Sequence, residues 1–199
     1  MAFVSKTKIA NLAFGHLHER HTIANIETDT SAPGTLANLW YDIARQEVLE
    51  AANWTFARGS LLLAAHNEDA PEDRWAYRYQ FPADALISRY LENPGGPDAD
   101  AVPFDEERSP DGSKCVLTDL SEATLVYTRD EKNTGLFSAH FIIALSYRLA
   151  WYCPSITTKQ KLVDSIHAKY MDAVLSAGAI DANKTVSRPP RDAGHIRGR

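Results

Sequence analysis

Residues 31–52 constrain the fold of this chain most strongly, because they repeat apolar side chains at the spacing of an α-helix. Thr30 or Ser31 can cap the N-terminus of such a helix, and Pro33 is tolerated in its first turn. The apolar stripe consists of Leu36, Leu39, Trp40, Ile43 and Ala44, and it is extended by Val48, Leu49 and Ala52. We therefore expect a helix over 31–52 with this stripe packed against a core.

Three other segments carry the same periodic pattern. Ser5 precedes the first of them, Asn133 or Thr134 can cap the second, and Thr157 or Thr158 can begin the last. Together with the segment described above, the predicted helices span about 6–17, 31–52, 135–153 and 158–178. Helices are thus expected toward both ends of the chain.

The segment 54–129 differs, because it is rich in strand-forming residues and in turn signals. Part of it alternates in the manner of a half-buried strand, with aromatic side chains at Trp75, Tyr77, Tyr79 and Phe81. The dipeptide Asp111-Gly112 is a strong turn signal between candidate strands at 102–108 and 114–118. The predicted fold class is α+β, mainly α: a helical bundle with an inserted small antiparallel β subdomain and a flexible C-terminal tail.

Charge is distributed unevenly along the chain, whose formal net charge is −5. Residues 181–199 hold five basic and two acidic side chains, a net +3, so the rest of the chain carries −8. Because this segment has few apolar side chains, it should be flexible until a partner orders it. The sequence therefore predicts a core over 1–180 and a tail over 181–199, and only the tail could attract an acidic partner.

The candidates for catalysis and for metal binding are weak. His16, His18 and His21 are close in sequence, but only the last two could share a helix face, and no matching pair of Cys or His lies elsewhere. The acidic residues of 68–73 and 105–107 are neighbours in predicted loops, whereas glycosidases place two carboxylates across a cleft. Neither a Gly-x-Ser-x-Gly motif nor a phosphate-binding loop is present. We expect no catalysis, no cofactor and no metal ion.

Other features also favour a structural interpretation. Cys115 and Cys153 are expected to be buried free thiols. The aromatic strand lies near Arg74, Arg78 and Arg89 and could stack nucleic-acid bases, but its acidic flanking loops favour packing in a core. No apolar run reaches the roughly 20 residues of a membrane span, and no signal peptide is visible, so we expect the protein to mature in the cytoplasm.

The order of four sequence stretches resembles that in a known family. The first stretch is a helix motif at 8–17. The second is a connector at 23–29, which leads into a long helix that ends in the W-x-F-A pattern of 47–57. The third is a Y-x-Y-x-F-P-x-D pattern within 75–84, and the fourth is the pair 117–119 and 126–129. They cover most of residues 6–175, and they resemble the phage head–tail adaptor family whose prototype is the tail tubular protein A of short-tailed phages. The departure is His18, where many relatives have glycine after the first helix.

The resemblance implies a structural virion protein without enzymatic activity. Its expected place is a dodecameric ring in the neck of the virion, between portal and tail, after assembly in the host cytoplasm. The expected partners are the portal protein, the tail tube or nozzle protein, further copies of the chain, and genomic DNA that passes without specific binding. An acidic body suits that passage, because each Lys or Arg contact with phosphate adds affinity. No membrane contact is expected.

Two surfaces are candidates for these contacts. The tail should dock on the portal through Lys184, Arg188, Arg191, His195, Arg197 and Arg199. A hairpin loop should face the tail components through Glu106, Glu107, Arg108, Asp111 and Gly112. The alternatives are a virion-associated cell-wall hydrolase, which needs a carboxylate of raised pKa in a cleft, and another neck component such as a head-closure or tail-completion protein. A nucleic-acid-binding regulator is disfavoured by the acidic body.

Overall fold

Three helices begin at serine residues whose hydroxyl groups cap them. The Oγ atoms of Ser5, Ser31 and Ser138 each accept a hydrogen bond from a backbone N–H group in the first turn, at 3.2, 3.3 and 3.2 Å. Such caps satisfy N–H groups that have no partner within the helix. The helices are α1 (Lys6–His16), α2 (Ala32–Ala51) and α3 (Ala139–Tyr152). The last of these begins later than the predicted residue 135, because the 3₁₀ turn η2 (Thr134–Leu136) precedes it.

The computed structural model describes residues 4–19, 21–71, 74–96, 99–154 and 160–183. Its last helix, α4 (Gln160–Asn183), continues past Gly178, where the sequence predicted an end. Residues 181–183 were expected in the tail but belong to α4, and 184–199 lie outside the described residues. Within the described ranges, every helix is too short or too polar to cross a membrane.

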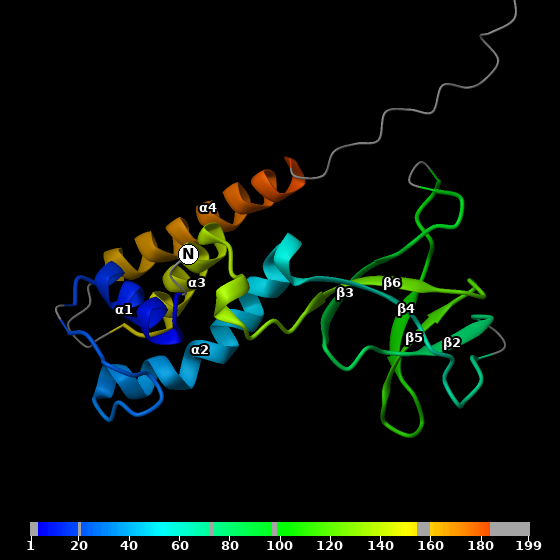
Figure 1. Ribbon diagram of the computed structural model, residues 1–199, viewed down its shortest axis with the longest axis horizontal. Helices are drawn as coiled ribbons and strands as arrows, with labels where there is room; N and C mark the ends of the chain where they lie inside the picture. The colour runs from blue at the N-terminus through cyan, green and yellow to red at the C-terminus, as the bar shows by residue number, and fades with distance from the viewer. Residues whose placement is uncertain (1–3, 20, 72–73, 97–98, 155–159, 184–199) are drawn as a thin grey trace, which may run out of the picture.

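Helix α3 is the element against which α1, α2 and α4 all pack. Figure 1 shows α4 along one edge of the helical half and α2 along the other, with α3 between them. Small side chains allow this close approach, since Ala37 and Ala44 of α2 and Ala144 of α3 are fully buried. Larger apolar side chains fill the remaining space, among them Ile9, Phe14, Val48, Phe141, Leu145, Leu149 and Ile166.

Trp54 connects the end of α2 to this core. Its indole Nε1 donates a hydrogen bond to the carbonyl of Val48 at 2.6 Å, and its ring meets the ring of Phe141 edge to face at 5.0 Å. Phe56 packs against the same phenylalanine from the short turn η1 (Thr55–Ala57). These aromatic residues were expected to open the β subdomain, but they belong to the helical core.

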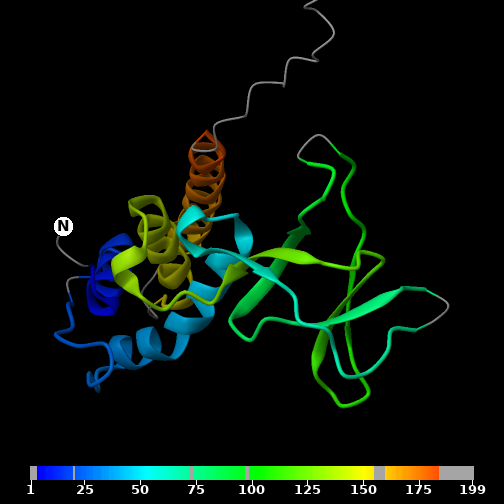
Figure 2. The same cartoon turned by 45° about the vertical axis from the view of Figure 1, so that its right-hand side comes forward.

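Six strands form two antiparallel sheets of three strands each within the described residues. In the first sheet, β6 (Thr124–Arg129) lies between β1 (Arg58–Leu62) and β3 (Ala85–Leu91). In the second, β5 (Lys114–Thr118) lies between β2 (Tyr77–Gln80) and β4 (Asp105–Arg108). Figure 2 shows this β half beside the helical half, and the chain passes from α2 through η1 into β1.

The two sheets are joined at both edges. Beyond β1, Ala65 bridges to Tyr79 of β2, and at the end of β3, Leu91 bridges to Val102, which precedes β4. These bridges pair backbone groups that would otherwise be exposed at open sheet edges. The closed arrangement encloses a second core, formed by Leu63, Tyr79, Leu91, Val116, Ala123, Leu125 and Tyr127.

The predicted fold class, a mainly α helical bundle with a small inserted β subdomain and a flexible tail, is wrong. The chain is a mixed fold of four helices and two sheets among the described residues, 43% helical and 20% strand. The β half is a substantial unit with its own core, because its sheets close on each other. In addition, the apolar stripe predicted on α2 is exposed at Leu36, Leu39 and Ile43, although its residues Ala44, Val48 and Leu49 are buried.

Candidate functional site

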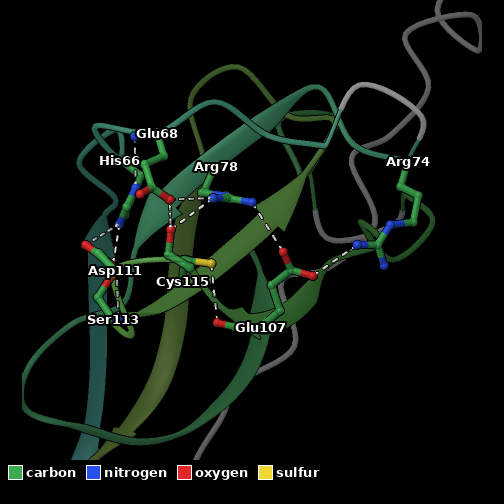
Figure 3. A network of polar contacts seen from close by, with 9 residues as sticks. His66, Glu68, Arg74, Arg78, Glu107, Asp111, Ser113 and Cys115 are labelled. Carbon is green, nitrogen blue, oxygen red and sulfur yellow. Dashed lines mark hydrogen bonds and ion pairs between the residues drawn. The ribbon is translucent and has the colours of Figure 1, made fainter.

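A network of polar side chains covers part of the second sheet and the segment that precedes β2 (Figure 3). Its centre is the buried guanidinium of Arg78, which donates to Glu68 at 3.1 Å, to Ser109 at 2.9 Å and to Glu107 at 3.3 Å. Glu107 also accepts a hydrogen bond from Arg74 at 3.1 Å. Each of the two carboxylates is thus neutralised by arginine. The Nε atom of Arg78 is buried and has no hydrogen-bond partner among the described residues.

The residues predicted to form a tail-facing loop lie at this network, but only some of them are in a loop. Glu106, Glu107 and Arg108 belong to strand β4, so the observed loop between β4 and β5 is shorter than predicted. Asp111 and Gly112 do lie in the turn between β4 and β5, where Gly112 has a φ of +86° that favours glycine.

The carboxylate of Glu106 is engaged at the same hairpin. It forms an ion pair with Lys114 at 2.6 Å. Burial alone would raise the pKa of Glu106, but hydrogen bonds from Lys114 and Ser88 and the positive charge of Lys114 outweigh it and hold this pKa below its usual value. A general acid of a hydrolase needs the opposite shift.

His66, Ser113 and Asp111 are brought together, as the members of a catalytic triad would be (Figure 3). However, the Nδ1 atom of His66 accepts a hydrogen bond from the backbone N–H of Glu68 at 3.1 Å, so the neutral ring carries its proton on Nε2. That Nε2 lies 3.0 Å from the Oγ of Ser113, which itself donates to Asp111 at 2.6 Å. His66 is therefore the donor toward Ser113. In this state it cannot accept the proton of the serine hydroxyl, as the histidine of a catalytic triad must.

Both cysteines are buried and free, as predicted. Burial raises the pKa of the Cys153 thiol to about 12, and burial is also the main cause of the raised pKa of Cys115. The Cys115 thiol donates to the backbone carbonyl of Glu107 at 3.3 Å. Thiols in this state are poor nucleophiles, because the thiolate is the reactive form.

The histidines near the end of α1 do not converge. His16 stacks on Tyr147 with ring centroids 3.9 Å apart and contacts the hydroxyl of Ser146 at 3.0 Å. His21 instead lies 3.2 Å from the hydroxyl of Ser31. Among the described residues, no group of three or more His, Cys, Asp or Glu side chains is arranged to hold a metal ion.

The aromatic strand does not present a basic stacking platform. Tyr79 points into the second core and donates its hydroxyl to the carbonyl of Leu120 at 2.8 Å. Only Tyr77 is exposed among the aromatic residues of β2. The nearby Arg74 and Arg78 are held by acidic side chains, as described above, which does not fit a surface that grips phosphates.

Part of the apolar stripe predicted on α2 is exposed. Leu36, Leu39 and Ile43 are exposed, Leu39 to 62%, although they were expected to face the core. The buried face of α2 carries Ala44, Val48 and Leu49 of the predicted stripe together with Ala37 and Tyr41. Nothing in the sequence shows that α3 approaches the small residues of this face.

A matching stripe lies on α4. Met171 and Leu175 are exposed, Leu175 to 68%, and the exposed Ala168 continues the same face toward the N-terminus of the helix. The opposite face, with Ile166, Tyr170 and Ala177, packs against the rest of the helical half. Exposed leucines gathered on one helix face mark candidate contact surfaces.

The stripe on α2 stands on a rigid support. Trp40 stacks flat on Tyr152 of α3 at 4.5 Å, and Tyr152 donates its hydroxyl to Glu47 at 2.7 Å. Glu47 also accepts a hydrogen bond from Arg148 at 2.7 Å. These contacts fix α2 on α3, so the stripe is held in place before any partner arrives.

The predicted portal-docking residues lie outside the described residues, so their surroundings are undefined here: Lys184, Arg188, Arg191, His195, Arg197 and Arg199. Comparison with known proteins adds no assignment, since no family model and no curated protein match the chain. Function must therefore be argued from the geometry of the described residues and from the sequence.

Proposed function

We propose that this chain is a structural protein of a tailed bacteriophage, a subunit of the adaptor ring that joins the portal to the tail. The observation that carries the proposal is the pair of exposed apolar stripes on α2 and α4, at opposite edges of the helical half. A subunit with two different contact surfaces can join a neighbour on each side, as a ring requires.

The polar network fits this proposal better than it fits an enzyme. Its carboxylates are paired with arginine or lysine. His66 carries its proton on Nε2, the nitrogen that would have to accept the serine proton in a catalytic triad. Such pairs fix the β4–β5 hairpin to the segment before β2. In the proposed ring, this hairpin faces the tail components through Glu106, Glu107, Arg108, Asp111 and Gly112.

The residues behind the family resemblance have structural roles that support the same proposal. Trp54 and Phe56 of the W-x-F-A pattern lie where the helical core meets the β half. Asp84, at the end of the Y-x-Y-x-F-P-x-D pattern, accepts a hydrogen bond from Tyr127 at 2.9 Å. A family that keeps this fold would need these residues whatever its partners are.

The proposed partners are the portal, the tail tube or nozzle, and further copies of the chain. Genomic DNA passes through the ring without specific binding, which suits a body with net negative charge. The basic segment 184–199 docks on the portal, because its positive charges can be attracted by acidic groups there.

A truncation tests this assignment. A chain ending at Asn183 keeps the whole of α4, so it should fold with an unchanged melting temperature. We expect the full chain to cosediment with the portal protein encoded in the same genome and the truncated chain to lose that binding. A truncated chain that binds portal as well as the full chain would contradict the docking role of the tail. A full chain that does not bind portal at all would contradict the proposed function.

A further inference from the structure

We propose that two arginines, one from each half of the molecule, form a reciprocal latch that sets the orientation of the β half on the helical half. Arg45 belongs to α2 and reaches the segment that follows β6, whereas Arg89 belongs to β3 and reaches the end of α2. The orientation is a property of the free chain, so it does not depend on the proposed function. In the proposed ring, it determines where the β4–β5 hairpin points.

The apolar cores of the two halves are separate. The core of the β half is formed by residues between Leu63 and Tyr127, all of which lie outside the helices. The helical core is contacted by Leu86 of β3, and by Phe56 and Phe137 from the segments that connect the halves. Where two such units share only a limited interface, relative motion is the expected behaviour unless directed contacts prevent it.

The chain crosses between the halves twice. It leaves α2 through η1 into β1, and it returns from β6 through η2 to α3 (Figure 2). Apart from these short 3₁₀ turns, the two crossings at 52–57 and 130–138 have no regular structure. Segments of this kind can absorb the backbone rotation of a hinge, so the covalent connections alone do not fix the orientation.

Arg89 binds the end of α2 from the β half. Its Nη2 atom lies 3.1, 3.1 and 2.9 Å from the carbonyl oxygens of Leu49, Glu50 and Ala52. The last carbonyls of a helix have no partner within it, so a guanidinium is a suitable donor there. The Nε atom of Arg89 donates to the hydroxyl of Thr128 in β6 at 2.8 Å. Because the donors of arginine have a fixed planar geometry, this bond aims the guanidinium at the helix.

Arg45 makes the opposite contact from the helical half. Its side chain is buried, and its Nη1 atom donates to the carboxylate of Asp130 at 2.6 Å and to the carbonyl of Glu131 at 2.9 Å. The backbone N–H of Asp130 in turn donates to the carbonyl of Asp84 at 2.8 Å, so Arg45 holds a segment that is itself fixed to the β half. One contact would leave the halves free to turn about it, whereas two contacts at separate places fix the orientation.

Distances between spin labels, measured by double electron–electron resonance, test this latch. The labels are attached at Leu62→Cys in β1 and at Leu175→Cys in α4, because these residues are exposed to 61% and 68%. Cys115 and Cys153 are buried and burial raises the pKa of both thiols, so the label reacts with the introduced cysteines. The labelled chain with both arginines intact should give a single narrow distance distribution.

Arg89→Met removes the guanidinium but keeps an unbranched apolar side chain. We expect the distance distribution to become about twice as wide, because domains with a limited interface move relative to one another. Arg45→Met should have a similar effect, and the chain with both substitutions should give a wider distribution than either. Arg129→Met is the matched control, because Arg129 of β6 pairs with Asp84 at 3.5 Å within the β half. It should leave the distribution unchanged.

Circular dichroism and the melting temperature show whether each variant folds. If Arg89→Met does not fold, Thr128→Val decides, since it removes only the acceptor of the Arg89 Nε atom. A wider distribution in that variant supports the latch, and an unchanged one overturns it. A narrow distribution in folded Arg89→Met, or equal broadening in Arg129→Met, would also overturn the latch. Because the chain is measured alone, a failure to bind portal would contradict the proposed function and leave this result standing.

Discussion

Two arginines join the helical half to the β half. Arg45 of α2 is only 1% exposed, and its guanidinium donates to Asp130 at 2.6 Å and to the carbonyl of Glu131 at 2.9 Å. Arg89 of β3 donates to carbonyls at the end of α2, those of Leu49, Glu50 and Ala52, at 3.1, 3.1 and 2.9 Å. The second contact caps a helix C-terminus, where carbonyl groups lack partners and a positive charge is favourable.

The Arg45–Asp130 pair should make stability depend on pH. Burial would raise the pKa of Asp130, but the hydrogen bond and the charge of Arg45, aided by Lys132, hold this pKa below its usual value. A lowered pKa in the folded state means that the stabilisation is present above the unfolded pKa of about 3.9 and is lost as the pH falls. Asp130→Asn should therefore cost about 2 kcal/mol at neutral pH, because it leaves the buried Arg45 with only the exposed carboxylate of Asp42, 3.2 Å away, as its counterion.

Urea unfolding at pH 7 and at about pH 3 measures this effect. The difference in the free energy of unfolding between the variant and the wild type should be large at neutral pH. It should shrink in acid, where the wild-type carboxyl begins to take up a proton. Asp100→Asn, at an exposed site whose side chain has no hydrogen bond among those described, is the control. An equal destabilisation at both pH values would contradict the ion-pair account.

His18 is the one residue other than glycine with a positive φ in the described part of the chain, at 58°. It follows α1, where the chain turns and the N–H of Glu19 reaches back to the carbonyl of Phe14 at 3.0 Å. This geometry favours glycine, the residue that many members of the resembled family carry there. His18→Gly should stabilise the fold by about 0.5–1 kcal/mol.

A thermal scan measures that gain, which corresponds to a melting temperature higher by roughly 1–4 °C. His21→Gly is the comparison, because at an ordinary φ the same change adds freedom to the unfolded chain and also removes the contact of His21 with Ser31. The control should lower the melting temperature slightly. A lower melting temperature in His18→Gly would contradict the strain assigned to this position.

At the scale of elements, β1 and β6 depend on a glycine. Gly59 lies opposite Tyr127, and a Cβ atom at Gly59 would come within 2.7 Å of the ring of Tyr127. The missing side chain leaves room for the tyrosine, whose hydroxyl donates to Asp84. The ring lies in the second core, so the strand pair and the core are fixed together.

Gly59→Ala should destabilise the protein by about 1–3 kcal/mol, because the added methyl group overpacks the strand pair. Gly15→Ala is the matched control, since a Cβ atom there meets nothing within 4 Å and alanine favours the helix. It should be neutral or stabilising in the same chemical denaturation experiment. The penalty at Gly59 should largely vanish in a Tyr127→Leu background, and a penalty that persists there would contradict the packing argument.

The sequence was sufficient to locate the elements but not to orient them. Periodicity identified α2, but only part of its predicted stripe is buried, since Leu36, Leu39 and Ile43 are exposed. The buried face is rotated from the prediction because Ala37 and Ala44 let α3 approach closely. The closure of the two sheets was also hidden, since it depends on bridges between residues as distant as Ala65 and Tyr79.

At the scale of the whole molecule, the two halves are held in a fixed relation while two apolar stripes remain open. The polar network was invisible in the sequence, because Glu68, Arg78 and Glu107 come together only when the loop before β2 packs on the hairpin. These carboxylates are neutralised, so the described residues offer contact surfaces and no evident reaction centre. In the function proposed above, such a subunit acts through its neighbours.

Electron microscopy of the wild-type chain mixed with the portal protein of the same genome tests this account most directly. We predict that the chain forms a closed ring on one face of the portal, with the β4–β5 hairpin pointing away from the portal. Portal particles that remain bare at saturating concentrations of the chain would contradict it.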